Sequence, residues 1–249
     1  MSSVAGMMAV TGTLGGGGED PHWSNVALLL HGDNDPNGRL LNDSSSYQHN
    51  MYANNRISLQ TSPTPPYGTS SIQVANATNA LYTKTLSSPA IGTGDFTVEY
   101  SVYQDSLNNW HTHFGCRTGN ATNYLAQASN TWNMGVNGSG FLFVHRTQNN
   151  PVSFGVNGFT AGAWHDIALV RSSGTWAMWL NGSRVDTDTN YGSTNFNTKN
   201  YGIGTGANNY ATAERLRGHI MNLRFTVGVA RYNPSDTTIP TPTELFPIG

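Results

Sequence analysis

The chain has 249 residues, of which 10 % are charged, and a formal net charge of −2 at pH 7; this argues against a nucleic-acid partner, because binding to phosphate backbones depends on neutralisation by Lys and Arg. Hydrophobic residues make up 37 % of the chain, with 6 Trp, 11 Tyr and 9 Phe, enough to build a core and to exclude the highly charged kind of disorder. No apolar stretch approaches the length of about 20 residues that a membrane span needs, and the single cysteine, Cys116, excludes an intramolecular disulfide.

The first 24 residues differ from the rest of the chain. They are small and glycine-rich, and they show no hydrophobic period. This composition predicts a flexible N-terminal arm over residues 1–24, either a disordered tail or a segment that becomes ordered against a neighbouring subunit. The N-terminus lacks the basic and apolar regions of a signal peptide, so we expect none. A single domain is predicted over residues 25–249.

A strand is predicted in the first half of the chain, at residues 95–103. The segment 63–68 (PTPPYG) cannot be a central strand, because proline removes donors from the hydrogen-bond ladder. Alternate residues of a strand share a face. In the strand 95–103 one such row should therefore point into the core: Phe96, Val98, Tyr100 and Val102.

The second half contains a predicted hairpin, with strands at residues 164–171 and 176–180 joined by a short polar linker. The dipeptide Asn181-Gly182 after it is a strong turn signal. Both rows of the strand 176–180 are apolar, so we expect it to be covered on both faces. A further strand falls within residues 218–232. Short strands separated by frequent turns predict an all-β fold, a two-sheet antiparallel β-sandwich of jelly-roll type.

Five segments resemble one known family. The stretches WHDIALVR (164–171), TWAMWLNG (175–182) and GHIMNLRFTVGVARY (218–232), together with 26–33 and 95–103, are similar to the laminin-G/concanavalin-A-like sandwich family. They look most like its branch in bacteriophage virion proteins. The resemblance covers roughly residues 25–249 and implies the concanavalin-A-like fold. It says less about function, because functional sites are grafted onto folds.

Some members of this family are glycoside hydrolases, which need a pair of carboxylates. On the strand 95–103 this chain has Glu99 alone, with Thr97 and Ser101 at two-residue spacing. Glu99 is therefore interpreted as a surface or cross-strand hydrogen-bonding residue. We expect the chain not to be an enzyme and to have no catalytic residues.

Calcium is the cofactor that the resemblance suggests. Members of the family often hold Ca²⁺ through an acidic residue in the strand that corresponds to 218–232. At that position this chain has Met221, whose thioether is no calcium ligand. We therefore expect no cofactor, and calcium stays an alternative through three loop aspartates: Asp33, Asp35 and Asp43.

Carbohydrate binding is the remaining small-ligand interpretation. Lectin sites combine an aromatic ring with amide and hydroxyl groups on loops. Aromatic residues in asparagine-rich segments are the candidates, with two neighbouring amides: Trp110, Trp132, Tyr191, Tyr210, Asn109 and Asn209. The alternative is that these rings close the ends of the core or meet neighbouring subunits.

Two functional hypotheses follow. The first is a non-enzymatic structural component of a bacteriophage virion, a capsid decoration or a tail- or fibre-associated protein. Its arm would anchor it to other virion proteins, it would form homo-oligomers, and it could also adhere to host glycans. It would be assembled in the host cytoplasm without nucleic-acid or membrane contacts. The alternative is a carbohydrate-binding, lectin-like module of a bacterial surface or secreted protein.

Overall fold

A computed structural model describes residues 19–32, 41–54, 57–74, 80–83, 88–108, 110–117, 132–145, 151–196, 200–204 and 215–249. Within these ranges the chain forms one short 3-10 helix and fifteen strands: η1 (Trp23–Asn25), β1 (Val26–Leu30), β2 (Met51–Asn54), β3 (Ile57–Gln60), β4 (Ser71–Val74), β5 (Ala80–Thr83), β6 (Phe96–Gln104), β7 (His111–Arg117), β8 (Trp132–Val136), β9 (Phe141–His145), β10 (Pro151–Asn157), β11 (Trp164–Ser172), β12 (Thr175–Leu180), β13 (Ser183–Asp188), β14 (Asn200–Ile203) and β15 (Gly218–Val227). No helix in the described ranges has the length and apolar character needed to cross a bilayer.

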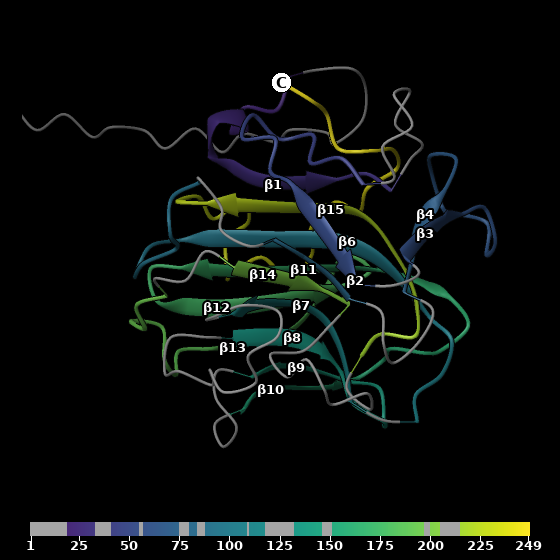
Figure 1. The fold of residues 1–249 in the computed structure, drawn as a ribbon. Coiled ribbons are helices and arrows are strands. Elements are labelled where there is room, and N and C mark those ends of the chain that lie inside the picture. Colours follow the sequence, from purple (N-terminus) through teal and green to yellow (C-terminus); the bar gives the residue numbers. More distant parts are fainter. Residues whose placement is uncertain are drawn as a thin grey trace, which may run out of the picture.

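The strands form two antiparallel sheets that pack face to face (Figure 1). Sheet A has the order β13-β12-β11-β6-β15-β4-β3, with β1 also paired to β15. Sheet B has the order β10-β9-β8-β7-β14-β5-β2. Strands distant in sequence are neighbours, as β6 and β15 show. The predicted two-sheet antiparallel jelly-roll sandwich is confirmed.

Strand β6 lies in the middle of sheet A and shows how the sequence pattern builds the core. The predicted inward row is buried in the main hydrophobic cluster between the sheets: Phe96, Val98, Tyr100 and Val102. The opposite row, which includes Thr97, Glu99 and Ser101, lies on the outer face of sheet A. The alternation therefore sorts apolar side chains from polar ones across this strand.

Two tight turns join β11, β12 and β13. Ser173 and Gly174 connect the first pair, and Asn181 and Gly182 connect the second. All four residues have positive φ angles, between 48° and 82°. Two-residue hairpin turns of type I′ require this conformation, which Gly and Asn adopt at little cost. The turn predicted at Asn181-Gly182 is confirmed.

Aromatic rings fill the centre of the sandwich and enclose a buried cation. Ring centroids lie 4.9–6.5 Å apart in a cluster of seven side chains: Phe96, Phe114, Trp132, Trp176, Phe196, Tyr201 and Phe225. The guanidinium of Arg171 lies over three of these rings and donates to the carbonyl oxygens of Gly92, Gly94 and Thr194. Burial lowers the pKa of Arg171 to about 10. Arg171 thus ties two loops to the core.

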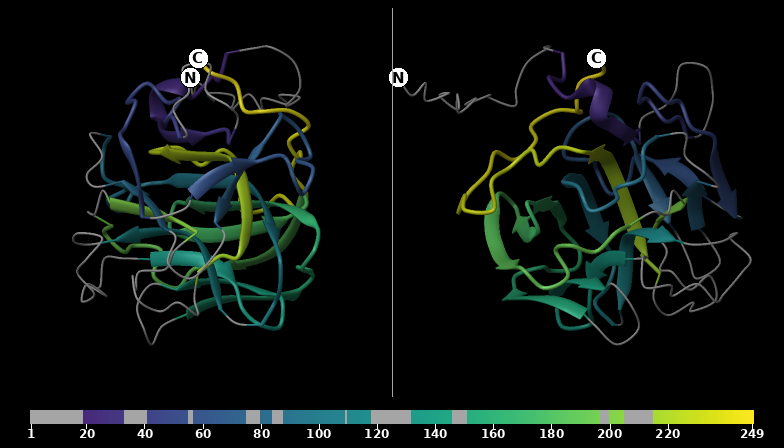
Figure 2. Two further views of the ribbon diagram at one scale, coloured as in Figure 1. Left: turned by 45° about the vertical axis from the view of Figure 1, so that its right-hand side comes forward. Right: turned by 90° about the vertical axis from the view of Figure 1, so that its left-hand side faces the viewer.

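The C-terminal segment, residues 228–249, runs along the outer face of sheet A (yellow in Figure 2, right). Its side chains pack on a small apolar cluster of β11 and β12: Ala168, Val170, Ala177 and Trp179 beneath Ala230, Tyr232 and Ile239. The indole N–H of Trp179 also donates to the carbonyl of Asp236 at 3.1 Å. The other row of β12 faces the main core. Strand β12 is therefore covered on both faces, as predicted.

The folded domain includes residues that the sequence assigned to the arm. Residues 19–24 lie against the sandwich, and the Asp20 side chain is buried. Its carboxylate accepts hydrogen bonds from Arg224 at 2.9 Å and from Arg231 at 2.8 Å. The predicted boundary at residue 24 is therefore wrong for these residues. The error arose because the partners of Asp20 lie more than 200 residues away in the sequence.

Candidate functional site

Among the described residues, Trp110 is the most exposed tryptophan, with 39 % of its surface accessible. It directly precedes β7, whose first residue pairs with the last residue of β8. Because the two strands are antiparallel, Trp110 lies opposite Asn137, the first residue of the β8–β9 turn. The structure therefore places this predicted platform at an end of sheet B, beside a polar turn.

The turn beside Trp110 presents amide and hydroxyl groups. The Asn137 Oδ1 accepts hydrogen bonds from the backbone N–H groups of Ser139 and Phe141, at 2.8 and 3.0 Å. Both of these bonds use the oxygen, and neither uses the amide nitrogen of Asn137. Sugar recognition combines an aromatic ring with amide and hydroxyl groups.

Trp132 was predicted as a second platform, and the structure corrects this. Its side chain is 1 % exposed, and its ring packs against Phe96, Phe114 and Trp176 in the core. Asparagines flank it in the sequence, but β8 directs the ring between the sheets. A ring covered on both sides cannot stack on a sugar, so Trp132 is a core residue.

Tyr191 is half-buried in the turn that follows β13, where its φ angle is +61°. Its ring packs against the main hydrophobic cluster, which corresponds to the alternative interpretation of a ring that closes an end of the core. The other predicted residues, Tyr210, Asn109 and Asn209, lie outside the described residues.

Asp43, one of the three calcium candidates, is fully buried and engaged in hydrogen bonds within the protein. Its Oδ1 accepts from the backbone N–H groups of Leu29 and Ser45, and its Oδ2 lies 2.6 Å from the His49 Nδ1. Burial alone would raise the pKa of Asp43, but these bonds outweigh burial and hold the pKa below its usual value. Asp43 therefore organises the loop after β1.

The other two aspartates, Asp33 and Asp35, lie outside the described residues. In the part of the chain that the structure describes, no group of three or more His, Cys, Asp or Glu side chains is arranged to hold a metal ion.

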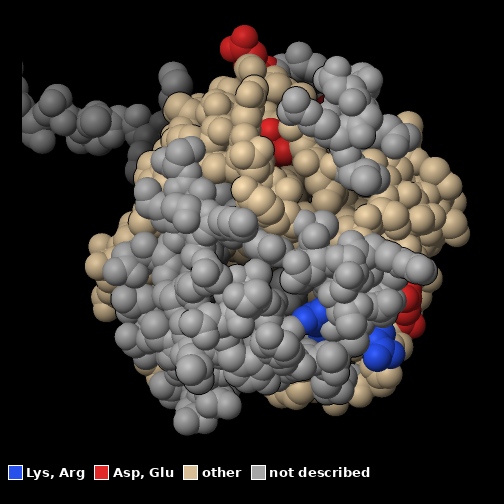
Figure 3. Space-filling model, in the orientation of Figure 1, with Lys and Arg blue, Asp and Glu red and all other residues tan. Residues whose placement is uncertain are grey.

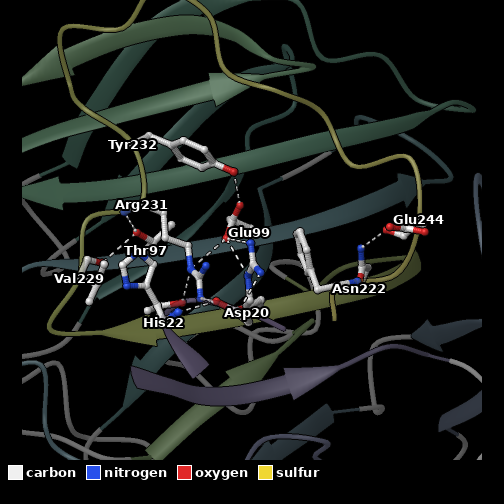
Figure 4. A network of polar contacts seen from close by, with 12 residues as sticks. Asp20, His22, Thr97, Glu99, Asn222, Val229, Arg231, Tyr232 and Glu244 are labelled. Atoms are coloured by element: carbon white, nitrogen blue, oxygen red, sulfur yellow. Dashed lines mark hydrogen bonds and ion pairs between the residues drawn. The ribbon is translucent and has the colours of Figure 1, made fainter. Parts of the chain in front are cut away.

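Glu99 belongs to a buried network under the C-terminal segment (Figure 4). Its Oε2 accepts two hydrogen bonds from Arg224 at 2.9 and 3.0 Å, and its Oε1 accepts one from Tyr232 at 2.6 Å. Arg224 pairs with Glu99 across β15 and β6, and it also reaches Asp20. Of the two roles predicted for Glu99, the cross-strand one is confirmed and the surface one is wrong.

This network binds four segments together. Arg231 of the C-terminal segment donates to Asp20 near the N-terminus and to Thr226 of β15. Burial and the neighbouring Glu99 raise the pKa of Tyr232, so its hydroxyl remains a donor. Each charged side chain of the network is paired with one of opposite charge. The network therefore holds the N-terminal residues, β6, β15 and the C-terminal segment together.

A part of the outer face of sheet A lies beyond the C-terminal segment and carries aromatic side chains. Trp164 of β11 and Tyr103 of β6 are register partners with ring centroids 5.8 Å apart, and both are partly exposed. His219 of β15 follows in the same row, 6.1 Å from Tyr103. Burial lowers the pKa of His219, so its ring is neutral at pH 7.

Next to this row, Asp166 of β11 lies at the edge of a shallow pocket. Its Oδ1 accepts hydrogen bonds from Ser101 at 2.5 Å and from Tyr67 at 3.3 Å. Tyr67 and Ser101 are also bonded to each other. Burial raises the pKa of Asp166, and the two hydroxyl donors only partly offset this effect. The pocket, of about 270 Å³ including space open to solvent, has walls from Trp179, Tyr232 and residues 239–242.

This second surface was not predicted from the sequence. Period-two alternation places Trp164 and Asp166 on one face of β11, so the pair could have been found from the pattern. The contribution of Tyr67 could not, because it comes from the proline-rich segment and reaches Asp166 across 99 residues.

The fold defines a lectin-like class of β-sandwich. A family model described as the concanavalin A-like lectin/glucanases superfamily matches residues 68–227. The chain belongs to this family. The match ends at the last residue of β15 and leaves out the C-terminal segment. No curated protein matched the sequence.

Solved structures show the same fold at low identity. The binding domain of botulinum neurotoxin serotype D is 14 % identical, with a TM-score of 0.58 over 83 % of this chain and 49 % of that one. The binding domain of botulinum neurotoxin DC, in complex with SialylT, is 14 % identical, with a TM-score of 0.56 over 82 % and 48 %. The chain thus spans about half the length of these toxin domains.

A bacterial enzyme module matches over most of its length. Domain 4 of an extracellular arabinanase from Geobacillus stearothermophilus, in complex with arabinotriose, is 14 % identical, with a TM-score of 0.55. The alignment covers 82 % of this chain and 93 % of that one.

Proposed function

We propose that this chain is a carbohydrate-binding module without catalytic activity. The observation that carries the proposal is the exposed ring of Trp110, which lies at the end of a lectin-like sandwich, opposite the β8–β9 turn in the strand register. Aromatic rings supply apolar contact to the C–H face of a sugar, and neighbouring amides bond its hydroxyls. Two structurally similar modules were solved with SialylT and arabinotriose, which makes glycans the first ligands to test.

The charge of the chain supports the same ligand class. Charged residues are 10 % of the sequence, against about 25 % in ordinary domains. The described part of the face in Figure 3 shows only scattered charged side chains. Such a surface favours hydrogen bonding to neutral sugars over electrostatic recognition. Glu99 supports a non-catalytic role, because Arg224 and Tyr232 already hold both of its carboxylate oxygens.

Replacing Trp110 by alanine should weaken glycan binding at least about tenfold, a loss of about 1.4 kcal/mol. The measurement is titration calorimetry with soluble arabinan and with sialylated oligosaccharides. The matched control is Tyr52→Ala, which removes a ring of similar exposure, 36 %, from β2. Equal affinities for W110A and the wild-type chain would contradict a binding role for Trp110.

The virion hypothesis rests on the sequence motifs alone. We infer from the motifs that particle association, in contact with capsid or tail proteins and with other copies of this chain, is the second candidate function. Quantitative mass spectrometry of purified particles tests it. A fixed copy number relative to the major capsid protein is expected, and absence of the chain from particles would remove this candidate.

A further inference from the structure

The outer face of sheet A is divided between a covered and an open part. The C-terminal segment covers the cluster around Trp179. The start of β11 and the end of β6 lie outside this cover and keep Trp164 and Tyr103 partly exposed. Adjacent, partly exposed aromatic rings on a sheet, beside a pocket, favour a binding surface, because each ring leaves some apolar area in contact with water.

The Trp164 ring is held in place before any ligand arrives. Its indole N–H donates to the carbonyl of Thr64 at 2.8 Å, so the segment between β3 and β4 fixes one edge of the ring. Tyr103 packs beside it. A ring fixed in this way loses little conformational entropy on binding, which favours affinity.

Asp166 supplies a polar group within reach of the ring. It lies two residues from Trp164 on the same face of β11, roughly 7 Å along the strand. Both hydroxyl donors reach its Oδ1, so neither of these bonds uses Oδ2, and Asp166 lines the pocket. A carboxylate oxygen accepts hydrogen bonds from sugar hydroxyls and repels anionic groups.

We propose that Trp164, Tyr103 and Asp166 form a second carbohydrate subsite, which takes a neutral glycan whose ring lies on Trp164 and whose hydroxyls bond Asp166. The ligand class rests on the proposed function, but the residues do not overlap with the Trp110 surface. The pocket is open to solvent, so the glycan would lie across the sheet with one substituent directed into the pocket.

The test compares four variants by titration calorimetry: W164A, D166N, W110A and W110A/W164A. The probes are soluble arabinan as the neutral polymer and polygalacturonate as the anionic one. D166N keeps one acceptor oxygen and replaces the other by an N–H donor. Because burial raises the pKa of Asp166, its charge costs stability above that pKa. The neutral amide should therefore fold, and thermal melts check this.

The proposal expects binding of arabinan but not of polygalacturonate. It also expects an affinity loss of at least about tenfold in both W164A and D166N, with a further loss in the double variant. Three results would overturn it: unchanged affinity in folded W164A and D166N, preference for the anionic polymer, or no binding by the wild-type chain. If W164A and D166N bind normally and only W110A loses affinity, the second subsite is contradicted but the proposed carbohydrate-binding function is not. If the wild-type chain does not bind, both the subsite and the proposed function are contradicted.

Discussion

Replacement of Arg224 by alanine is expected to lower the free energy of unfolding by about 3–5 kcal/mol, the usual cost of breaking a buried ion pair. Arg224 pairs with Glu99 and with Asp20, and its side chain is 2 % exposed. Its removal leaves two buried carboxylates with fewer donors, and it also removes the guanidinium that lies 3.7 Å from the ring centroid of Phe246. Denaturant unfolding followed by tryptophan fluorescence measures the change.

The control is Arg217→Ala, which removes the same side chain from an exposed position directly before β15. We expect its effect to stay within about 0.5 kcal/mol, as for most surface substitutions. If R224A were no less stable than R217A, the network in Figure 4 would not contribute to stability.

The same variant should unfold at a higher pH in acid. Burial alone would raise the pKa of Asp20, but the hydrogen bond and charge of Arg231, with a contribution from Arg224, hold it below its usual value. A carboxylate with a lowered pKa stabilises the fold above its unfolded pKa of about 3.9, and this contribution is lost as the pH falls through the folded value. Without Arg224 the folded pKa rises, so circular dichroism should show the acid transition at a higher pH. An unchanged midpoint would contradict this coupling.

Trp132→Ala should be similarly damaging, with a loss of about 3–5 kcal/mol, the range for large-to-small changes of a buried aromatic residue. The ring contacts four aromatic neighbours in the centre of the sandwich, so its removal opens a cavity that rigid strands on both sides cannot close. Thermal and denaturant unfolding measure the loss.

Trp110→Ala is the matched control for this substitution, because it removes the same side chain from the surface. It should melt within a few degrees of the wild-type chain. If W132A melted as close to the wild-type chain as W110A, the central ring cluster would not contribute to stability as proposed.

Local patterns were sufficient to predict the fold but not the sites. The alternation of β6 assigned Phe96 and Tyr100 to the core, and Asn181-Gly182 identified a turn, because each signal depends on neighbouring residues. The role of Trp132 could not be predicted in this way. Its asparagine neighbours are typical of a loop, and the strand direction that turns the ring inward depends on pairing with β7 and β9.

The candidate sites were predicted in part for the same reason. Trp110 was chosen as a candidate from the sequence because an aromatic residue next to asparagines is a local feature of the chain. The surface around Trp164 depends on segments far apart in the sequence, since Asp166 bonds Tyr67 from the β3–β4 connection and shares a pocket with Tyr232 from the C-terminal segment. Only the tertiary structure brings these three side chains together.

The contacts that join residues 19–24 to the C-terminal segment bring the two ends of the described domain close together. His31 bonds the carbonyl of Phe246 at 2.8 Å, and Gly249 lies against the indole of Trp23. The first and last described residues of the domain are thus close to each other. A short peptide could link residue 249 to residue 19, and new termini could be opened at the Ser173-Gly174 turn without removing a strand. Such a circularly permuted chain would keep every sheet pairing, and the domain could equally be inserted into a surface loop of a host protein.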